Sequence, residues 1–216
     1  MNAPAIESGK RQVAAPETQR PRTANVLLAG VGGQGVLVAS EVLAFAAVSD
    51  GLEAKQSEVH GVAQRGGSVV SHVRFGQTVH SPLIPCGDAD LLYGGEPLEA
   101  LRYAHYVRPG GTFFMDDRVI KPIQLPDEPD QIYPQGIAEF LRGKGYEIVP
   151  IPAFQAATEL GEPRCANIVL LGALSTRLGL SDAAWQASLQ KRLPAKIVEL
   201  NRRAFARGRQ LAGVPG

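Results

Sequence analysis

The segment from Gly30 to Gly35 constrains the fold of this chain more than any other. It has the sequence Gly-Val-Gly-Gly-Gln-Gly and satisfies the pattern G-x-G-x-x-G. A short apolar run (residues 25–29) precedes this glycine loop, and a stretch rich in Ala, Leu and Val (residues 36–48) follows it. This order predicts a strand, a tight turn and a helix that packs closely on the strand, with Gly51 ending the helix.

The rest of the chain alternates strand-like and helix-like segments. We expect a hairpin or meander over residues 68–79, and strands at residues 90–95, 111–115 and 146–151, with a turn at Pro109-Gly110. We expect helices at residues 96–107, 137–143, 154–160, 165–178 and 182–207, the last one capped by Ser181. This alternation predicts an α/β fold, a three-layer Rossmann-like domain with a mostly parallel sheet and a helical C-terminal region.

Length and composition indicate a single domain. A chain of 216 residues with 44% hydrophobic content can bury one sizeable core. Residues 1–23 mix Pro, Ala, Gln, Ser and Arg without an apolar period, so we expect a disordered N-terminal arm there. The domain is then expected at residues 24–209, with a short tail at residues 210–216.

Charge and cysteine content exclude several classes of protein. The 22 basic and 21 acidic residues nearly cancel, so no global field draws the chain to nucleic acid or to a membrane surface. No apolar run approaches the roughly 20 residues that span a bilayer. The two cysteines, Cys86 and Cys165, are far apart, so we expect no metal site on this chain. Without a signal-peptide pattern, the expected location is cytoplasmic.

The glycine loop has the features of a phosphate site, because free backbone N–H groups and the helix dipole favour an anion. Binding of NAD further requires an acid about 20 residues later, at the end of a second strand. Glu53 lies at a suitable distance, but polar residues follow it and no apolar strand precedes it. A nicotinamide-dependent reductase is therefore the weaker interpretation. The alternative that the glycines only allow close helix packing stays open.

A second candidate surface is the polar segment 57–68, which we expect to be a binding loop between two regular elements. Within it, Arg65 stands beside two glycines and could pair with a phosphate or a carboxylate, although a solvated turn is equally compatible with the sequence. Further along, His72 and Arg74 alternate with apolar residues, so we expect both on a solvated or subunit-facing strand surface.

Together, the glycine loop and the segment Ser57–Phe75 resemble the beta subunit of indolepyruvate:ferredoxin oxidoreductase, a member of the 2-oxoacid:acceptor oxidoreductase gamma-domain family. The resemblance spans about residues 24–209, because it also covers residues 87–90, 167–174 and 201–205. It implies a small subunit of a thiamine diphosphate-dependent complex that oxidatively decarboxylates a 2-oxoacid. Indolepyruvate or another arylpyruvate is the implied substrate, coenzyme A the acyl acceptor and ferredoxin the electron acceptor.

The resemblance also implies how the parts of the complex are divided. Thiamine diphosphate, Mg²⁺ and [4Fe-4S] clusters are carried by the large (alpha) partner subunit, so this chain has no catalytic residue, holds no cofactor alone and is inactive alone. Relatives imply two copies of each chain. The residues implied to bind coenzyme A are Gly30, Gly32, Gly33, Gln34, Gly35, Gln64, Arg65 and Asn167. A stand-alone regulatory module that senses a nucleotide through the same loop is the remaining alternative.

Overall fold

The structure is a computed structural model that describes residues 23–60, 66–120 and 133–213. The strands are β1 (Ala24–Val31), β2 (Glu53–His60), β3 (Ser68–Gly76), β4 (Ala89–Gly94), β5 (Val107–Asp116) and β6 (Glu147–Ile151). The helices are α1 (Val36–Ser49), α2 (Pro97–Arg102), α3 (Ile137–Gly143), α4 (Ala153–Glu159), α5 (Ala166–Ser175), α6 (Asp182–Arg192) and α7 (Ala195–Leu211). Two short 3₁₀ turns are η1 (Ala104–Tyr106) and η2 (Pro163–Cys165).

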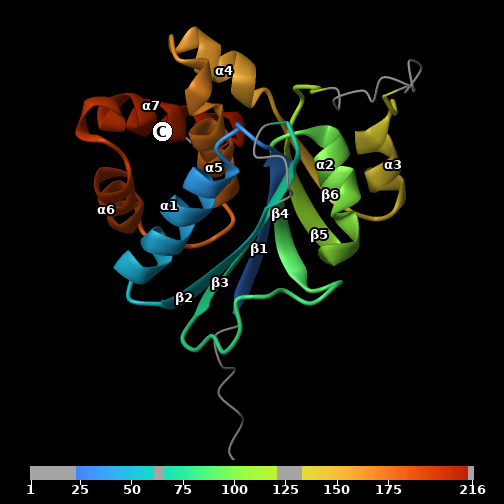
Figure 1. The fold of residues 1–216 in the computed structure, drawn as a ribbon, viewed down its shortest axis with the longest axis horizontal. Helices are drawn as coiled ribbons and strands as arrows, with labels where there is room; N and C mark the ends of the chain where they lie inside the picture. The colour runs from blue at the N-terminus through green and yellow to red at the C-terminus, as the bar shows by residue number, and fades with distance from the viewer. Residues whose placement is uncertain (1–22, 61–65, 121–132, 214–216) are drawn as a thin grey trace, which may run out of the picture.

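The strands form one six-stranded sheet in the order β2-β3-β1-β4-β5-β6. Strand β1 is parallel to β4, β4 to β5 and β5 to β6, whereas β3 is antiparallel to both β1 and β2. Helices α1, α4, α5, α6 and α7 cover one face, and α2 and α3 cover the other (Figure 1). The prediction of a three-layer α/β domain with a mostly parallel sheet is therefore confirmed.

Helix α5 lies at the centre of the larger helical layer and is buried along nearly its whole length. It crosses α7 so closely that each helix uses a glycine at the contact. A Cβ added at Gly208 would lie 1.8 Å from the carbonyl oxygen of Val169, and one at Gly172 would lie 2.1 Å from that of Phe205. None of the helices in the described part of the chain has the length and hydropathy that a membrane span requires.

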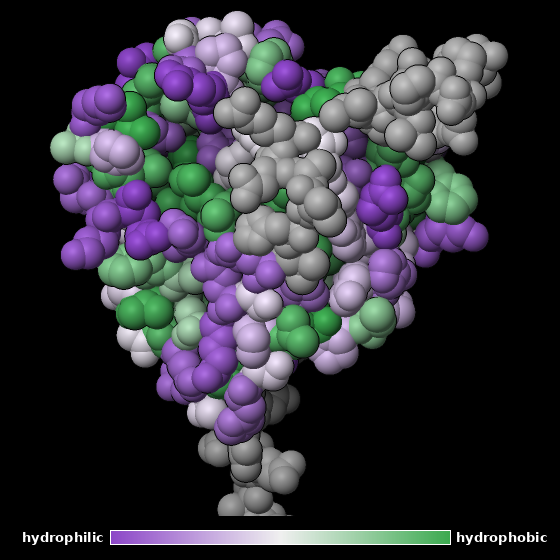
Figure 2. Space-filling model, viewed as in Figure 1, coloured by the Kyte–Doolittle hydropathy of each residue, from purple (hydrophilic) through white to green (hydrophobic). Residues whose placement is uncertain are grey.

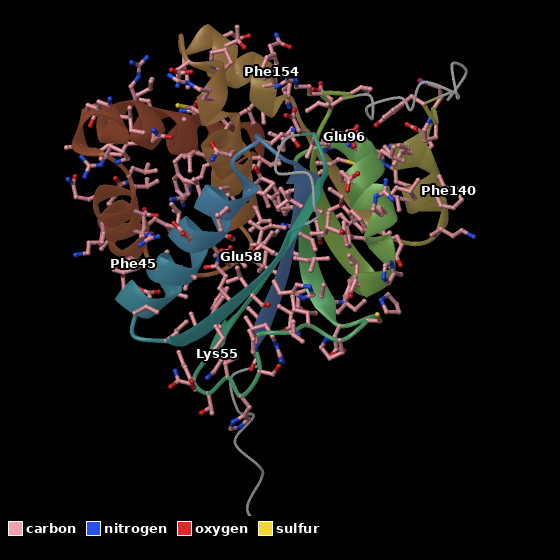
Figure 3. The ribbon with its side chains drawn as sticks, viewed as in Figure 1. Phe45, Lys55, Glu58, Glu96, Phe140 and Phe154 are labelled. Atoms are coloured by element: carbon pink, nitrogen blue, oxygen red, sulfur yellow. The ribbon has the colours of Figure 1, made fainter. Side chains whose placement is uncertain are left out.

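Strand β2 was not expected from the sequence, and the position of this strand in the sheet explains why. It is an edge strand with polar residues along its length, and its Lys55 and Glu58 side chains are labelled in Figure 3. Figure 2 shows hydrophilic residues over the area where β2 and β3 lie. Polar and charged side chains are typical of sheet edges because they discourage pairing with another chain. The pattern of apolar alternation therefore fails for this strand.

Three further expectations were wrong. His72 is buried, because the Tyr106 ring of η1 packs edge-on against it, and its Nδ1 accepts a hydrogen bond from the N–H of Ile84 (3.2 Å). Residues Pro109-Gly110 do not form a turn between a helix and a strand but lie inside β5, where the pairing with β4 shifts register. The expected helix 182–207 is two helices, α6 and α7, separated at Leu193 and Pro194, although Ser181 caps α6 as predicted.

Candidate functional site

A cavity of about 340 Å³ opens at the carboxyl end of β1, where the glycine loop joins α1. The loop lies at the upper ends of the central strands, beneath α4 (Figure 1). Several segments that are far apart in the sequence contribute to the wall. The lining residues are Val31, Gly32, Gly33, Gln34, Gly66, Tyr93, Gly95, Arg118, Ile120, Phe154, Pro163, Arg164, Ala166 and Asn167. Ligands bind at this end of the strands in open α/β sheets.

Tight backbone geometry explains the glycines of the loop. The N–H of Gln34 donates to the carbonyl of Val31 (3.0 Å) and closes the turn. Gly33 and Gly35 have φ values of 102° and 74°, a region that side chains rarely allow. A Cβ at Gly35 would also lie 2.5 Å from Asn167 Nδ2, whereas one at Gly33 would meet nothing within 4 Å. Gly33 therefore leaves open space at the cavity, and Gly35 allows close packing.

Gln34 and Asn167, both predicted site residues, use their amides to hold the loop. The Oε1 atom of Gln34 accepts from the N–H of Val31 (2.7 Å), and its Nε2 donates to the carbonyl of Gly95 (2.6 Å). Asn167 Nδ2 donates to the carbonyl of Gly35 (3.1 Å). These bonds connect the loop to the end of β4 and to the start of α5. Both side chains line the cavity while fixing the shape of the loop.

The backbone N–H groups of the loop differ in availability. Gly32 N–H donates to Gly67 (2.7 Å), and the Gly32 carbonyl accepts from Gly66 N–H (3.2 Å), so residue 32 is tied to the chain before β3. Within the described residues, the N–H groups of Gly33 and Gly35 have no partner, and α1 begins without a side-chain cap. These groups and the positive end of the helix dipole favour an anion at this place.

Two arginines and an aromatic ring, which the sequence analysis did not single out, complete the wall. The Arg118 guanidinium lies 3.8 Å from the centroid of the Phe154 ring, and no described carboxylate forms an ion pair with it. Arg164 is paired with Glu162 (Nη2–Oε2, 2.6 Å), and these hydrogen bonds lower the pKa of Glu162 to about 2. Arg118 follows the end of β5, so the rule that sites lie at the carboxyl ends of strands would have found it.

A buried carboxylate lies directly behind this wall. Asp116, the last residue of β5, is 3% exposed and accepts hydrogen bonds from the N–H groups of Ala153 (3.1 Å) and Phe154 (3.4 Å) at the start of α4. Burial raises the pKa of Asp116 to about 6, against the opposing effect of these hydrogen bonds. Asp116 thus holds the helix that carries Phe154. Across the described ranges, no three His, Cys, Asp or Glu side chains gather as metal ligands.

Not every predicted site residue can be placed. Gln64 and Arg65 lie outside the described residues, although Gly66, the next residue, lines the cavity. Gly30 lies at the end of β1, where a Cβ would come within 2.8 Å of Val36 Cγ2. Glu53 begins β2, which runs parallel to β1, so this acid lies at the opposite end of the sheet from the glycine loop. A ribose bound at the loop would be out of its reach.

This chain is similar in sequence to known proteins over most of its length. The family model for pyruvate ferredoxin/flavodoxin oxidoreductase matches residues 25–211. The indolepyruvate oxidoreductase subunit IorB of Thermococcus kodakarensis is 37% identical over 85% of this chain and 93% of its own length. The 2-oxoglutarate synthase subunit KorC of Methanothermobacter marburgensis is 30% identical over 86% of this chain and 95% of its own.

Solved structures show the same fold. The gamma subunit of a keto/oxoacid ferredoxin oxidoreductase from Geobacter sulfurreducens has a TM-score of 0.67 and 28% identity, over 88% of this chain and 98% of that one. The 2-oxoglutarate:ferredoxin oxidoreductase of Magnetococcus marinus also has a TM-score of 0.67, with 25% identity, and this chain covers 31% of it. The chain therefore belongs to the pyruvate ferredoxin/flavodoxin oxidoreductase family, among its small subunits.

Proposed function

We propose that this chain is the small subunit of a 2-oxoacid:ferredoxin oxidoreductase acting on indolepyruvate or other arylpyruvates, and that its cavity binds coenzyme A. The observation that carries the proposal is the glycine loop at the carboxyl end of β1, where the N–H groups of Gly33 and Gly35 have no described partner. The IorB relatives, 34% to 37% identical to this chain, support the choice of an arylpyruvate.

The chemistry of the cavity suits the nucleotide end of coenzyme A. That end carries several phosphates and an adenine ring. Backbone N–H groups and a helix N-terminus bind phosphate, and Arg118 adds a positive charge beside them. The Phe154 ring provides an apolar surface on the same wall. The M. marinus relative was solved with coenzyme A and succinyl-CoA bound, which supports this class of ligand.

In this proposal the two kinds of subunit divide the reaction. The large subunit carries thiamine diphosphate, Mg²⁺ and the [4Fe-4S] clusters, and it decarboxylates the 2-oxoacid. The acyl group passes to coenzyme A and the two electrons leave through the clusters to ferredoxin. The small subunit holds the nucleotide end of coenzyme A and is inactive alone. We further propose an assembly with two copies of each chain, located in the cytoplasm.

The test is to co-express this chain with its large subunit and to assay dye reduction by arylpyruvates at varied coenzyme A. In Arg118→Ala, we expect the KM for coenzyme A to rise roughly tenfold, because a hydrogen bond to a charged phosphate contributes about 1.5 kcal/mol or more. The KM for the 2-oxoacid should not change. Arg65→Ala is expected to act in the same direction.

Arg142→Ala is the matched control, since Arg142 lies on α3, away from the cavity lining, and its ion pair among the described residues is with Glu139 in the same helix. An unchanged KM for coenzyme A in Arg118→Ala would contradict binding at this cavity. If the chain alone bound a nicotinamide cofactor and turned over, the subunit assignment would be wrong.

A further inference from the structure

Two carboxylates are buried at the start of α2, next to the cavity but outside its lining. Glu96 is 1% exposed and Glu99 is 6% exposed. Figure 3 shows Glu96 at the upper end of α2, at the end of the sheet that carries the cavity. Burial of an ionised carboxylate without compensating hydrogen-bond donors costs several kcal/mol. Both Glu96 and Glu99 are therefore expected to have donors around them.

Glu96 accepts hydrogen bonds from three donors, which belong to three parts of the chain. Its Oε2 accepts from the N–H of Glu99 (2.9 Å) and caps α2. Its Oε1 accepts from the Tyr133 hydroxyl (2.6 Å) and, at 3.4 Å, from the N–H of Ile120. A cap needs only one acceptor oxygen. The second oxygen instead binds the chain after β5, where Ile120 and Arg118 line the cavity.

Glu99 contacts the chain next to another part of the wall, the part that contains Gly66. Its Oε2 accepts from the Ser68 hydroxyl, which also lies 3.1 Å from the Tyr103 hydroxyl. Its Oε1 accepts from Arg102 Nε (3.3 Å). Ser68 begins β3 immediately after Gly66-Gly67, the residues that are hydrogen-bonded to Gly32 of the loop. Glu99 thereby fixes the chain that lies against the glycine loop.

The residue before Glu96 completes the arrangement. Gly95 accepts from Gln34 Nε2 (2.6 Å) and donates to the carbonyl of Ala29 (2.8 Å). The short stretch from Gly95 to Glu99 thus contacts the glycine loop, the first residue of β3 and the chain after β5. Each contact lies at or next to a different part of the cavity wall, and the three parts are far apart in the sequence.

We propose that Glu96 and Glu99 are positioning residues, which hold the Ile120 and Gly66 walls against the glycine loop and thereby set the affinity for coenzyme A. This inference rests on the proposed function. The two carboxylates do not contact the ligand. Loosening either wall should weaken the binding of coenzyme A while leaving the decarboxylation of the 2-oxoacid unchanged, because that step takes place on the other subunit.

Tyr133→Phe tests the role of Glu96 at the Ile120 wall without removing a buried carboxylate. It deletes the hydroxyl that donates to Glu96 and accepts from the N–H of Leu98 (3.1 Å). Ser68→Ala deletes the hydroxyl that donates to Glu99 and tests the Gly66 wall in the same way. In the two-subunit complex, we expect each variant to raise the KM for coenzyme A about fivefold, with kcat and the KM for the 2-oxoacid unchanged.

Tyr146→Phe is the matched control, since its hydroxyl contacts the carbonyl of Ala104 (3.5 Å) and its ring packs on Phe113, away from the cavity lining. It should leave the KM for coenzyme A as in the wild type. If Tyr133→Phe and Ser68→Ala leave this KM unchanged while Arg118→Ala raises it, the positioning role is refuted and the proposed function stands. If Arg118→Ala also leaves it unchanged, both are refuted.

Discussion

Replacing Gln34 with glutamate exchanges the amide NH2 group for a carboxylate oxygen and leaves the shape of this side chain in the glycine loop nearly unchanged. In the wild type, Oε1 accepts from the N–H of Val31 and Nε2 donates to the carbonyl of Gly95. An ionised glutamate keeps the first bond, but its second oxygen then faces the Gly95 carbonyl at the distance that Nε2 now spans, 2.6 Å. Two acceptors would oppose each other with no proton between them.

The cost follows from the groups involved. The lost hydrogen bond contributes about 1 kcal/mol, and leaving a buried carbonyl without its donor costs a further 1–3 kcal/mol or so. Gly95 is buried, so water does not replace the amide. We expect the free energy of unfolding of Gln34→Glu to fall by about 2–4 kcal/mol at neutral pH. For a chain of this length, the melting temperature should fall by roughly 4–16 °C.

Acid should restore the lost stability. A protonated glutamate donates to the Gly95 carbonyl as the amide does, so the native state raises the pKa of the introduced carboxyl. The deficit relative to wild type is then full above that raised pKa and disappears as the pH falls toward the ordinary value for glutamate, about 4.3. Urea denaturation of both proteins between pH 4 and pH 8 measures the difference at each pH.

The control is Gln190→Glu, which adds the same charge on the surface, where Oε1 of Gln190 already accepts from Arg202 (3.0 Å). It should be neutral or slightly stabilising at every pH. Equal stability of Gln34→Glu and wild type at neutral pH would refute the bond between Gln34 and Gly95. A deficit of the same size at pH 4 and pH 8 would refute the explanation by opposed acceptors.

Two further predictions concern the elements around the cavity. Burial raises the pKa of Asp116 from 3.8 to about 6, so the native state binds this proton more tightly and the free energy of unfolding falls by about 3 kcal/mol as the pH rises through this range. Asp116→Asn keeps the acceptor for the N–H of Ala153 and should remove that decrease in urea titrations. Gly208→Ala forces α5 and α7 apart and should lower the free energy of unfolding by about 3 kcal/mol or more in thermal melts, whereas Gly143→Ala, with no atom near its Cβ, should not.

The glycine loop and the parallel part of the sheet could be predicted because both depend on local patterns. Residues 25–48 carry a strand, a turn and a helix in sequence, and β4 and α3 follow from short apolar runs with clear ends. Strand β2 could not be predicted in this way. Its residues are polar because it lies at the sheet edge, and that position depends on the pairing of β3 with β1, which is not local.

The cavity was only partly predictable for a similar reason. The loop was predicted from its glycine motif, and Asn167, far away in the sequence, was predicted because it lies in a segment covered by the family resemblance. Arg118 and Phe154 were not predicted, because neither belongs to a motif, and they meet only where the end of β5 and the start of α4 lie beside the loop. His72 shows the converse, since the alternation of its strand indicated a solvated face, but η1 covers it and the Tyr106 ring packs edge-on at 5.4 Å.

The cavity combines two kinds of residues, and the distinction bears on how variants should be interpreted. The side-chain polar atoms of Gln34, Asn167 and Glu96 form hydrogen bonds within the protein, to backbone groups and, for Glu96, also to the Tyr133 hydroxyl. Changing these residues therefore alters the shape of the site and the stability of the chain together. Gly33 and the Arg118 guanidinium have no such hydrogen bonds among the described residues. Arg118 contacts the Phe154 ring, so changing Arg118 should lower affinity for the ligand much more than stability. A loss of binding without a loss of stability therefore identifies a ligand contact, whereas a loss of both identifies the scaffold that holds it.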